Sequence, residues 1–108
     1  MKRGDIVIVN AGGDYGKPRP AVIIQSDLFN GTHASVVVCL ITSELVDAPL
    51  FRLSIPKDPM NGLLHPSQIM IDKIVTIRCD KITQIIGYID DILLLQINRS
   101  LALFLAIA

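Results

Sequence analysis

Tryptophan is absent from this chain, and Phe and Tyr bring the aromatic content to only 5%. A row of aromatic side chains on which nucleic-acid bases stack is therefore not expected. The chain also lacks net charge, because ten Lys and Arg side chains balance ten Asp and Glu side chains. This balance excludes a protein that binds nucleic acid through its overall charge, so any nucleic-acid site must be a local basic patch.

Long hydrophobic runs are missing as well. The longest is Leu101–Ala108, far short of the ~18 residues that span a bilayer. The first ten residues carry charge and then a strand-length apolar run, which is too short for the core of a signal peptide. We expect a soluble, cytoplasmic protein with no membrane partner. Its two cysteines, Cys39 and Cys79, are then expected to be buried, reduced thiols, with a disulfide as the alternative.

No spacing of metal-ligand residues stands out. The only two histidines, His33 and His65, lie far apart in the sequence, so neither pairs with a second ligand on one element. His33 follows an Asn-Gly turn signal and is expected to be an exposed loop residue. His65 lies where a loop meets a strand, so it is either a plain loop residue or one that reaches a cleft. The sequence predicts neither a metal nor another cofactor.

What the chain does contain is 51% hydrophobic residues, arranged in strand-length runs. Such runs, bounded by Gly, Pro and Asn at intervals of roughly 8–12 residues, are typical of short strands in a small all-β domain. Residues 11–16 are expected to form a loop, and residues 73–83 an irregular segment. The expected strands are residues 5–10, 20–25, 34–42, 50–55, 67–72 and 85–89. The pattern predicts one mainly-β domain over residues 1–108, bent into a small barrel with a C-terminal helix.

The C-terminal helix is expected to begin at Asp90 or Asp91, because a carboxylate there accepts hydrogen bonds from the free N–H groups of the first turn. The helix that follows is apolar nearly all round. In so small a protein, such a helix must be buried on more than one side. Packing against the barrel and against a second copy of the chain would satisfy this requirement, which predicts a homodimer.

A basic segment stiffened by proline precedes the second strand. Pro18 and Pro20 bracket Arg19, and each proline favours extended backbone in the residue before it. Arg19 would thus stand at the mouth of a buried strand, where its planar guanidinium can grip a phosphate. The alternative is an ordinary strand start with Arg19 as a surface charge. Thr42 and Ser43, at the end of the third strand, either point into a cleft or satisfy their own turn.

Arginine, hydroxyl and carboxylate groups together suit RNA cleavage through the neighbouring 2′-hydroxyl. The substrate supplies its own nucleophile, so the protein needs only proton transfer and positive charge for the phosphorane. The candidate catalytic residues are Arg19, Thr42 and Asp72, and the candidate RNA-binding residues are Lys17, Gln25, Ser43, Lys73 and Arg78.

Motifs across nearly the whole chain resemble the MazF/PemK-like toxins of bacterial type II toxin–antitoxin systems. They are RGDIV at 3–7, GKPRPAVIIQSD at 16–27, CLITS at 39–43 and SQIMIDKIVTI at 67–77. The resemblance implies an SH3-like (CcdB-like) barrel, a homodimer, and a sequence-specific, metal-independent endoribonuclease of single-stranded mRNA that leaves a 2′,3′-cyclic phosphate. It also implies that Arg19 stabilises the phosphorane, that Thr42 positions the reacting group and that Asp72 assists as a base. A cognate antitoxin would occupy the RNA groove.

The chain departs from this family at two positions. Met70 and Val75 stand where members often carry arginine. One alternative is therefore a weak or inactive enzyme, kept to bind its antitoxin. Another is a non-nucleolytic toxin of the same barrel that poisons DNA gyrase.

Overall fold

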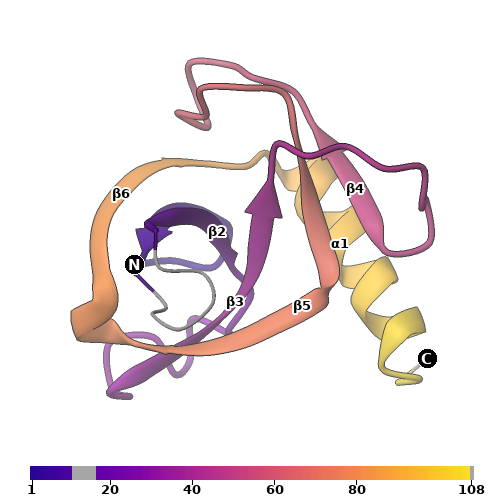
Figure 1. Cartoon of the computed structure of the whole chain (residues 1–108). Coiled ribbons are helices and arrows are strands. Elements are labelled where there is room, and N and C mark those ends of the chain that lie inside the picture. Colours follow the sequence, from indigo (N-terminus) through magenta and orange to yellow (C-terminus); the bar gives the residue numbers. More distant parts are fainter. Residues whose placement is uncertain (11–16, 108) are drawn as a thin grey trace.

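The computed structural model describes residues 1–10 and 17–107. The predicted loop over residues 11–16 lies outside this described part. A short 3-10 helix, η2 (Cys79–Lys81), joins the last two strands. The main elements are β1 (Asp5–Val9), β2 (Arg19–Ile23), β3 (Ser35–Thr42), β4 (Arg52–Ile55), β5 (Ser67–Arg78), β6 (Ile82–Tyr88) and α1 (Asp91–Phe104) (Figure 1). The prediction of a mainly-β chain with a C-terminal helix is confirmed.

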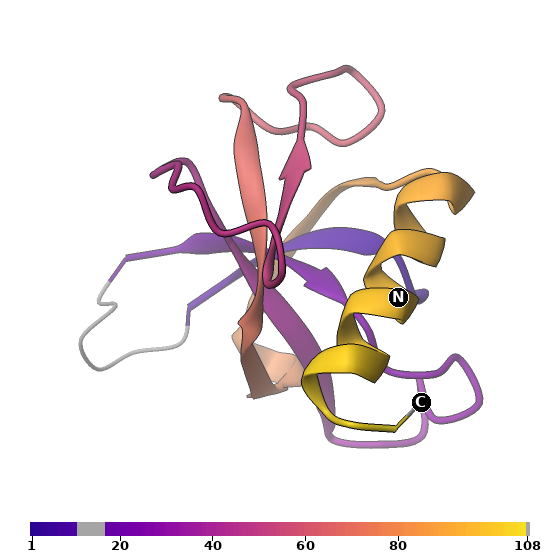
Figure 2. The same cartoon turned by 90° about the vertical axis from the view of Figure 1, so that its right-hand side faces the viewer.

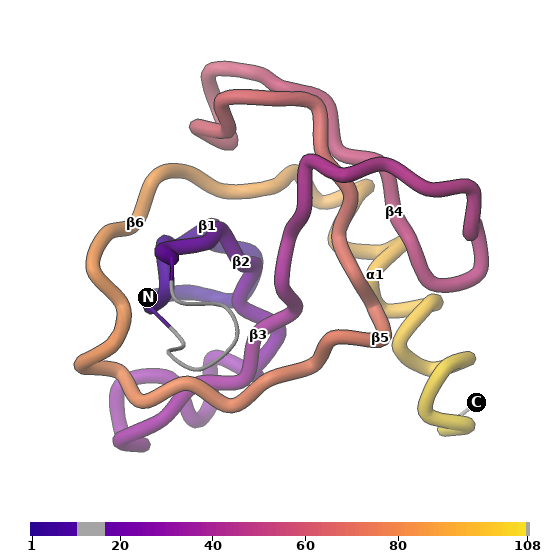
Figure 3. Tube along the Cα trace, in the orientation of Figure 1, coloured from indigo at the N-terminus to yellow at the C-terminus, as the bar shows by residue number. Residues whose placement is uncertain are grey.

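The strands form a single antiparallel sheet in the order β4-β5-β3-β2-β1-β6. The ladder between β3 and β5 is irregular between Cys39 and Ile41. Bulges of this kind bend a strand and increase its twist, and β5 turns sharply along its length (Figure 3). In this view the second half of β5 and β6 curve around β1 and β2 (Figure 3).

The fifth strand is longer than the sequence predicted. It continues through Lys73 to Arg78, and β6 begins at Ile82. The prediction of an irregular segment over residues 73–83 is therefore wrong. In the second half of β5, Lys73, Thr76 and Arg78 are exposed while Ile77 is buried. This is a strand with one face in solvent, where polar side chains are normal.

The segment between β4 and β5 reaches across to β6. The N–H of Tyr88 donates to the carbonyl of Met60 at 3.1 Å. A Cβ on Gly62 would lie 2.2 Å from the carbonyl oxygen of Ile86, and one on Gly87 would lie 2.3 Å from that of Met60. The two backbones therefore touch directly, at the two positions where glycine permits it.

Two clusters of buried side chains lie on the two faces of the sheet, since neighbouring residues of a strand point in opposite directions. Ile6 belongs to one cluster and Val7 to the other. The Ile6 cluster also contains Ile97 of α1, so this is the face that the helix covers (Figure 2). The described residues include no helix long and apolar enough to cross a membrane.

Asp90 caps the C-terminal helix. Its Oδ1 accepts a hydrogen bond from the N–H of Leu93 at 2.8 Å, which settles the choice between Asp90 and Asp91. Within one chain the helix is buried on one side only: Ile97 is fully buried, whereas Ile92 is 73% exposed. A single chain therefore leaves one side of α1 uncovered, and the expected burial of that side against a second copy stays a prediction. The outer face of the helix leaves apolar surface in solvent.

Replacing Ile97 with alanine is expected to lower the free energy of unfolding by about 2–5 kcal/mol, because it leaves a cavity between α1 and the sheet. The matched variant Ile92→Ala removes the same atoms from an exposed position of the same helix and should change stability by less than about 0.5 kcal/mol. Urea unfolding at a low protein concentration, followed by circular dichroism, measures both. Equal losses in the two variants would contradict this packing of the helix.

Candidate functional site

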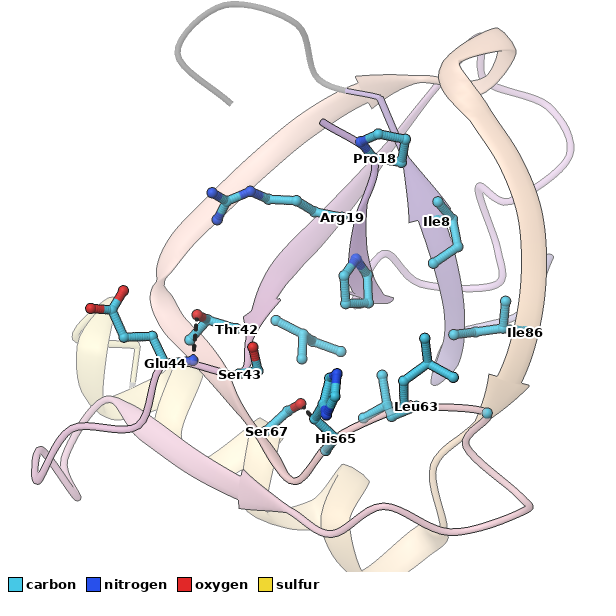
Figure 4. Close-up of a pocket in the computed structure, with 14 residues that line it drawn as sticks. Ile8, Pro18, Arg19, Thr42, Ser43, Glu44, Leu63, His65, Ser67 and Ile86 are labelled. Carbon is cyan, nitrogen blue, oxygen red and sulfur yellow. Dashed lines mark hydrogen bonds between the residues drawn. The ribbon is translucent and has the colours of Figure 1, made fainter. Parts of the chain in front are cut away.

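A pocket of about 510 Å³ opens at the end of the sheet where β2 begins and β3 ends (Figure 4). The strand register explains the place. Ala21 of β2 pairs with Leu40 of β3, and Arg19 and Thr42 each lie two residues beyond this pair, at the same end of the two antiparallel strands. Both side chains line the pocket. Two residues that the sequence singled out separately are thus brought together by one strand pairing.

Arg19 is held by the strand that it begins. It pairs with Val9 of β1, and the residues that follow Pro20, namely Ala21, Val22 and Ile23, are fully buried. The side chain of Arg19 is half-buried and lines the pocket. The structure thus has the predicted arrangement, an arginine at the mouth of a buried strand.

The end of β3 supplies hydroxyl groups. Thr42 Oγ1 accepts a hydrogen bond from the N–H of Glu44 at 3.1 Å, and both Thr42 and Ser43 line the pocket. The two alternatives for Thr42, a turn and a cleft, are therefore both realised. A hydroxyl that accepts an N–H keeps its own hydrogen for donation, so Thr42 can still donate to a ligand from a fixed position.

The opposite wall is the segment before β5. Asn61, almost fully buried, holds this segment: its side-chain amide donates to the carbonyl of Pro56 at 2.6 Å, and its Oδ1 accepts from the N–H of Leu63 at 2.9 Å. His65 and Ser67 follow and line the pocket. Ser67 Oγ donates to the carbonyl of His65 at 2.8 Å. A rigid buried asparagine thus positions the loop that carries His65.

Several predicted site residues lie outside this pocket. Asp72 is half-buried on β5, and its Oδ1 has no hydrogen-bond partner among the described residues. Asp72 lies in the irregular stretch of β5 between Ile69, which pairs with Ile41, and Ile74, which pairs with Cys39, and it does not line the pocket. Lys17 is exposed and precedes Pro18, which does line the pocket.

The other three predicted RNA-binding residues have structural contacts or face solvent away from the pocket. Gln25 holds the turn after β2, since its amide donates to Asn30 Oδ1 at 3.0 Å and its Oε1 accepts from the N–H of Val37 at 3.2 Å. Arg78 pairs with Asp80 at 2.6 Å, at the opposite end of the β3–β5 ladder from Thr42. Lys73 is exposed on β5.

Glu44, Ser67 and His65 line the pocket, although none was among the predicted site residues. Glu44 follows Thr42-Ser43 directly, so its proximity could have been read from the sequence. For His65 the sequence allows either a plain loop position or a cleft position, and in the structure it lines the pocket. The other histidine, His33, is exposed on its loop, as predicted.

Both cysteines are free, as predicted. Cys39 is buried, but Cys79 is only half-buried, so the prediction of burial is wrong for Cys79. Burial raises the pKa of the Cys39 thiol to about 12, and an alkylating reagent attacks only the thiolate. Iodoacetamide at pH 8 is therefore expected to leave Cys39 unmodified in the folded protein and to modify it fully in urea. Mass spectrometry of the two digests measures this. Rapid labelling of Cys39 in the native state would contradict its place in the core.

No group of three or more His, Cys, Asp or Glu side chains that could hold a metal ion occurs in the described part of the chain. Elsewhere on the surface, the pKa of Asp27 is lowered, chiefly because the backbone N–H of Arg3 donates to its carboxylate and also because the amide of Asn30 does. These contacts fix the N-terminus to the turn after β2.

The fold and the pocket together define a class: a small antiparallel-sheet protein with a C-terminal helix and an arginine–hydroxyl pocket at one end of the sheet. The family of PemK-like, MazF-like toxins of type II toxin–antitoxin systems matches residues 2–105. The chain belongs to this family, which confirms the resemblance seen in the motifs.

The alignments with individual relatives cover nearly the whole chain. It is 43% identical over 109 aligned positions to the probable endoribonuclease MazF of Mycolicibacterium smegmatis, covering 100% of this chain and 99% of the relative. It is 27% identical to endoribonuclease EndoA of Bacillus subtilis, covering 99% and 96%. Among solved structures, a mycobacterial endoribonuclease in complex with its cognate antitoxin superposes with a TM-score of 0.82 at 23% identity, covering 100% of this chain and 97% of that one. That likeness shows the same fold.

Proposed function

We propose that this chain is the toxin of a type II toxin–antitoxin pair and acts as an endoribonuclease on single-stranded mRNA. One observation carries the proposal: Arg19 and Thr42 line one pocket in a family whose curated relatives are named endoribonucleases. Cleavage is sequence-specific, needs no metal ion and uses the 2′-hydroxyl of the RNA itself.

The two pocket residues have separate roles in this reaction. The 2′-oxygen attacks the phosphorus, a 2′,3′-cyclic phosphate forms, and the bond to the 5′-oxygen breaks. Arg19 places its guanidinium against the phosphate oxygens, where negative charge grows in the phosphorane. Thr42, fixed by its bond from the N–H of Glu44, donates its hydroxyl hydrogen and positions the reacting group. Ser43, next to it, contacts the RNA.

Assistance by Asp72 as a base, and RNA contacts by Lys17, Gln25, Lys73 and Arg78, stay predictions. Asp72 lies outside the pocket, so its assistance would require RNA to run along β5. The departures at Met70 and Val75 also lie outside the pocket, because both side chains pack in the core cluster that contains Val38. They leave Arg19 and Thr42 in place, which supports an active enzyme over an inactive one.

The comparisons give no support to the alternative of gyrase poisoning. The quoted relatives carry endoribonuclease names, and one related structure holds an antitoxin.

The remaining parts of the proposal concern architecture and partners. We propose that residues 1–108 form one domain and that the sheet closes as an SH3-like barrel; the contact of residues 60–62 with β6 supports this closure. A homodimer is supported by the exposed apolar side chains of α1. A cognate antitoxin that covers the pocket and a cytoplasmic location complete the proposal.

Incubation of the purified protein with a long single-stranded RNA in EDTA tests this function. We expect discrete fragments that share a short sequence at their ends. A heat-denatured sample and a double-stranded RNA of the same sequence serve as controls. RNA that stays intact across many different sequences would contradict the proposal.

A further inference from the structure

The pocket is lined by an imidazole, that of His65, to which the proposed mechanism gives no role. The described residues that line the pocket include three that carry charge or titrate: Arg19, Glu44 and His65. Arginine stays protonated in proteins and cannot serve as a base. Abstraction of the proton from the 2′-hydroxyl must therefore fall to Glu44, to His65 or to a group outside the pocket.

The positions of these three groups favour the histidine. Arg19 lines the pocket from β2, with its guanidinium on the side where Thr42 lies, and the ring of His65 lies on the opposite wall, beside Ser67 and Leu63 (Figure 4). The carboxylate of Glu44 points away from His65 (Figure 4). In an in-line displacement the attacking and leaving oxygens lie on opposite sides of the phosphorus. A base on one wall and an arginine on the other fit this requirement.

Resting on the endoribonuclease function proposed above, we propose that His65 is the general base of the cleavage reaction. The neutral imidazole takes the proton from the 2′-hydroxyl as the bond from the 2′-oxygen to phosphorus forms. The bond from phosphorus to the 5′-oxygen then breaks, and that oxygen, on the Arg19 side, takes a proton from water. The hydroxide that remains takes the proton from the imidazolium, which restores neutral His65. Arg19 stabilises the negative charge of the phosphorane, and His65 accepts the proton of the 2′-hydroxyl, so the two residues have separate roles.

The place of His65 in the loop suits this role. Asn61 and Ser67 fix the backbone on either side of it, through the bonds from Asn61 to Pro56 and from Ser67 Oγ to the His65 carbonyl. Both bonds are independent of the imidazole, so replacing the ring leaves the loop in place. A change in cleavage on its replacement would therefore report on proton transfer and not on folding.

The test is a pH profile of cleavage by His65→Gln. A general base acts only in its unprotonated form, so the wild-type kcat should rise with pH to a plateau. In His65→Gln we expect kcat to fall by about 10²-fold or more with little change in KM, and the rise with pH to disappear. Added imidazole should restore part of the rate to His65→Ala.

Two variants provide the comparison. His33→Gln replaces the other histidine, which lies outside the pocket, and should keep the wild-type rate and profile. Glu44→Gln should keep the rise with pH. An unchanged rate in His65→Gln, or loss of the rise in Glu44→Gln instead, would overturn the assignment while wild-type cleavage still upholds the proposed function. A wild type that cuts no RNA at any pH would overturn both.

Discussion

Replacement of Arg19 by alanine is expected to lower the rate of RNA cleavage by about 10³-fold. Removing one preorganised group that stabilises transition-state charge typically costs between 10² and 10³ in rate, about 2.7–4 kcal/mol. Arg19 is the only arginine or lysine among the described residues that line the pocket, so no neighbouring cation replaces it. Single-turnover cleavage of a short RNA with one cut site measures the loss.

Two further variants separate the guanidinium from simple positive charge. Arg19→Lys keeps the charge but loses the planar pair of donors, and we expect a loss of at least about 10-fold. Arg99→Ala removes an exposed arginine from α1, outside the pocket, and should cleave as the wild type does. Circular dichroism should show the same fold in all three. Cleavage by Arg19→Ala at the wild-type rate would exclude Arg19 from the reaction.

A large loss of stability is expected for Gly62→Ala. The backbone of Gly62 has φ +70°, and an added Cβ would lie 2.2 Å from the carbonyl oxygen of Ile86. Since both atoms belong to packed backbone, the loop and β6 must separate, and we expect a loss of about 3 kcal/mol or more in the free energy of unfolding. The same loop carries Leu63 and His65 into the pocket, so cleavage should fall as well.

Gly31→Ala is the matched control for this variant. Gly31 also has a positive φ, +91°, but nothing lies within 4 Å of an added Cβ. It should therefore lose only the cost of a left-handed conformation, about 1–2 kcal/mol, and should keep its cleavage activity. The two urea midpoints, measured side by side, decide the matter. If Gly62→Ala were as stable as Gly31→Ala, the loop would not lie against β6 as described.

Local sequence patterns predicted those parts of the fold that depend on local chemistry. Runs of Val and Ile gave β1, β2 and β3 within one or two residues, and the carboxylate of Asp90 marked the start of α1. The second half of β5 was missed because its alternating polar side chains face solvent, which a single sequence cannot distinguish from a polar loop. The bend at Cys39–Ile41 left no recognisable sequence signal.

For the candidate site too, local sequence patterns predicted some residues and missed those whose position depends on contacts between distant segments. Arg19 and Thr42 each lie at the end of a recognisable strand, but the residues alone left both roles open, and the family motifs at 16–27 and 39–43 singled them out. The pairing of β2 with β3 places the two strand ends side by side. His65 could not be placed, because its position depends on a contact between Gly62 and Ile86, which lie far apart in the sequence. Asp72 lies in the stretch of β5 where the register shifts opposite Cys39–Ile41, and its position outside the pocket could not be predicted because the shift has no local sequence signal.

The chemistry of the fragment ends tests the central claim most directly. RNA cut by the purified protein in EDTA should carry a 2′,3′-cyclic phosphate on one side of the break and a 5′-hydroxyl on the other, as read by mass spectrometry. A substrate with a single 2′-deoxy nucleotide on the 5′ side of the cut site should stay intact, because it lacks the nucleophile. Cleavage of that substrate, or ends with a 3′-hydroxyl and a 5′-phosphate, would contradict a reaction through the 2′-hydroxyl.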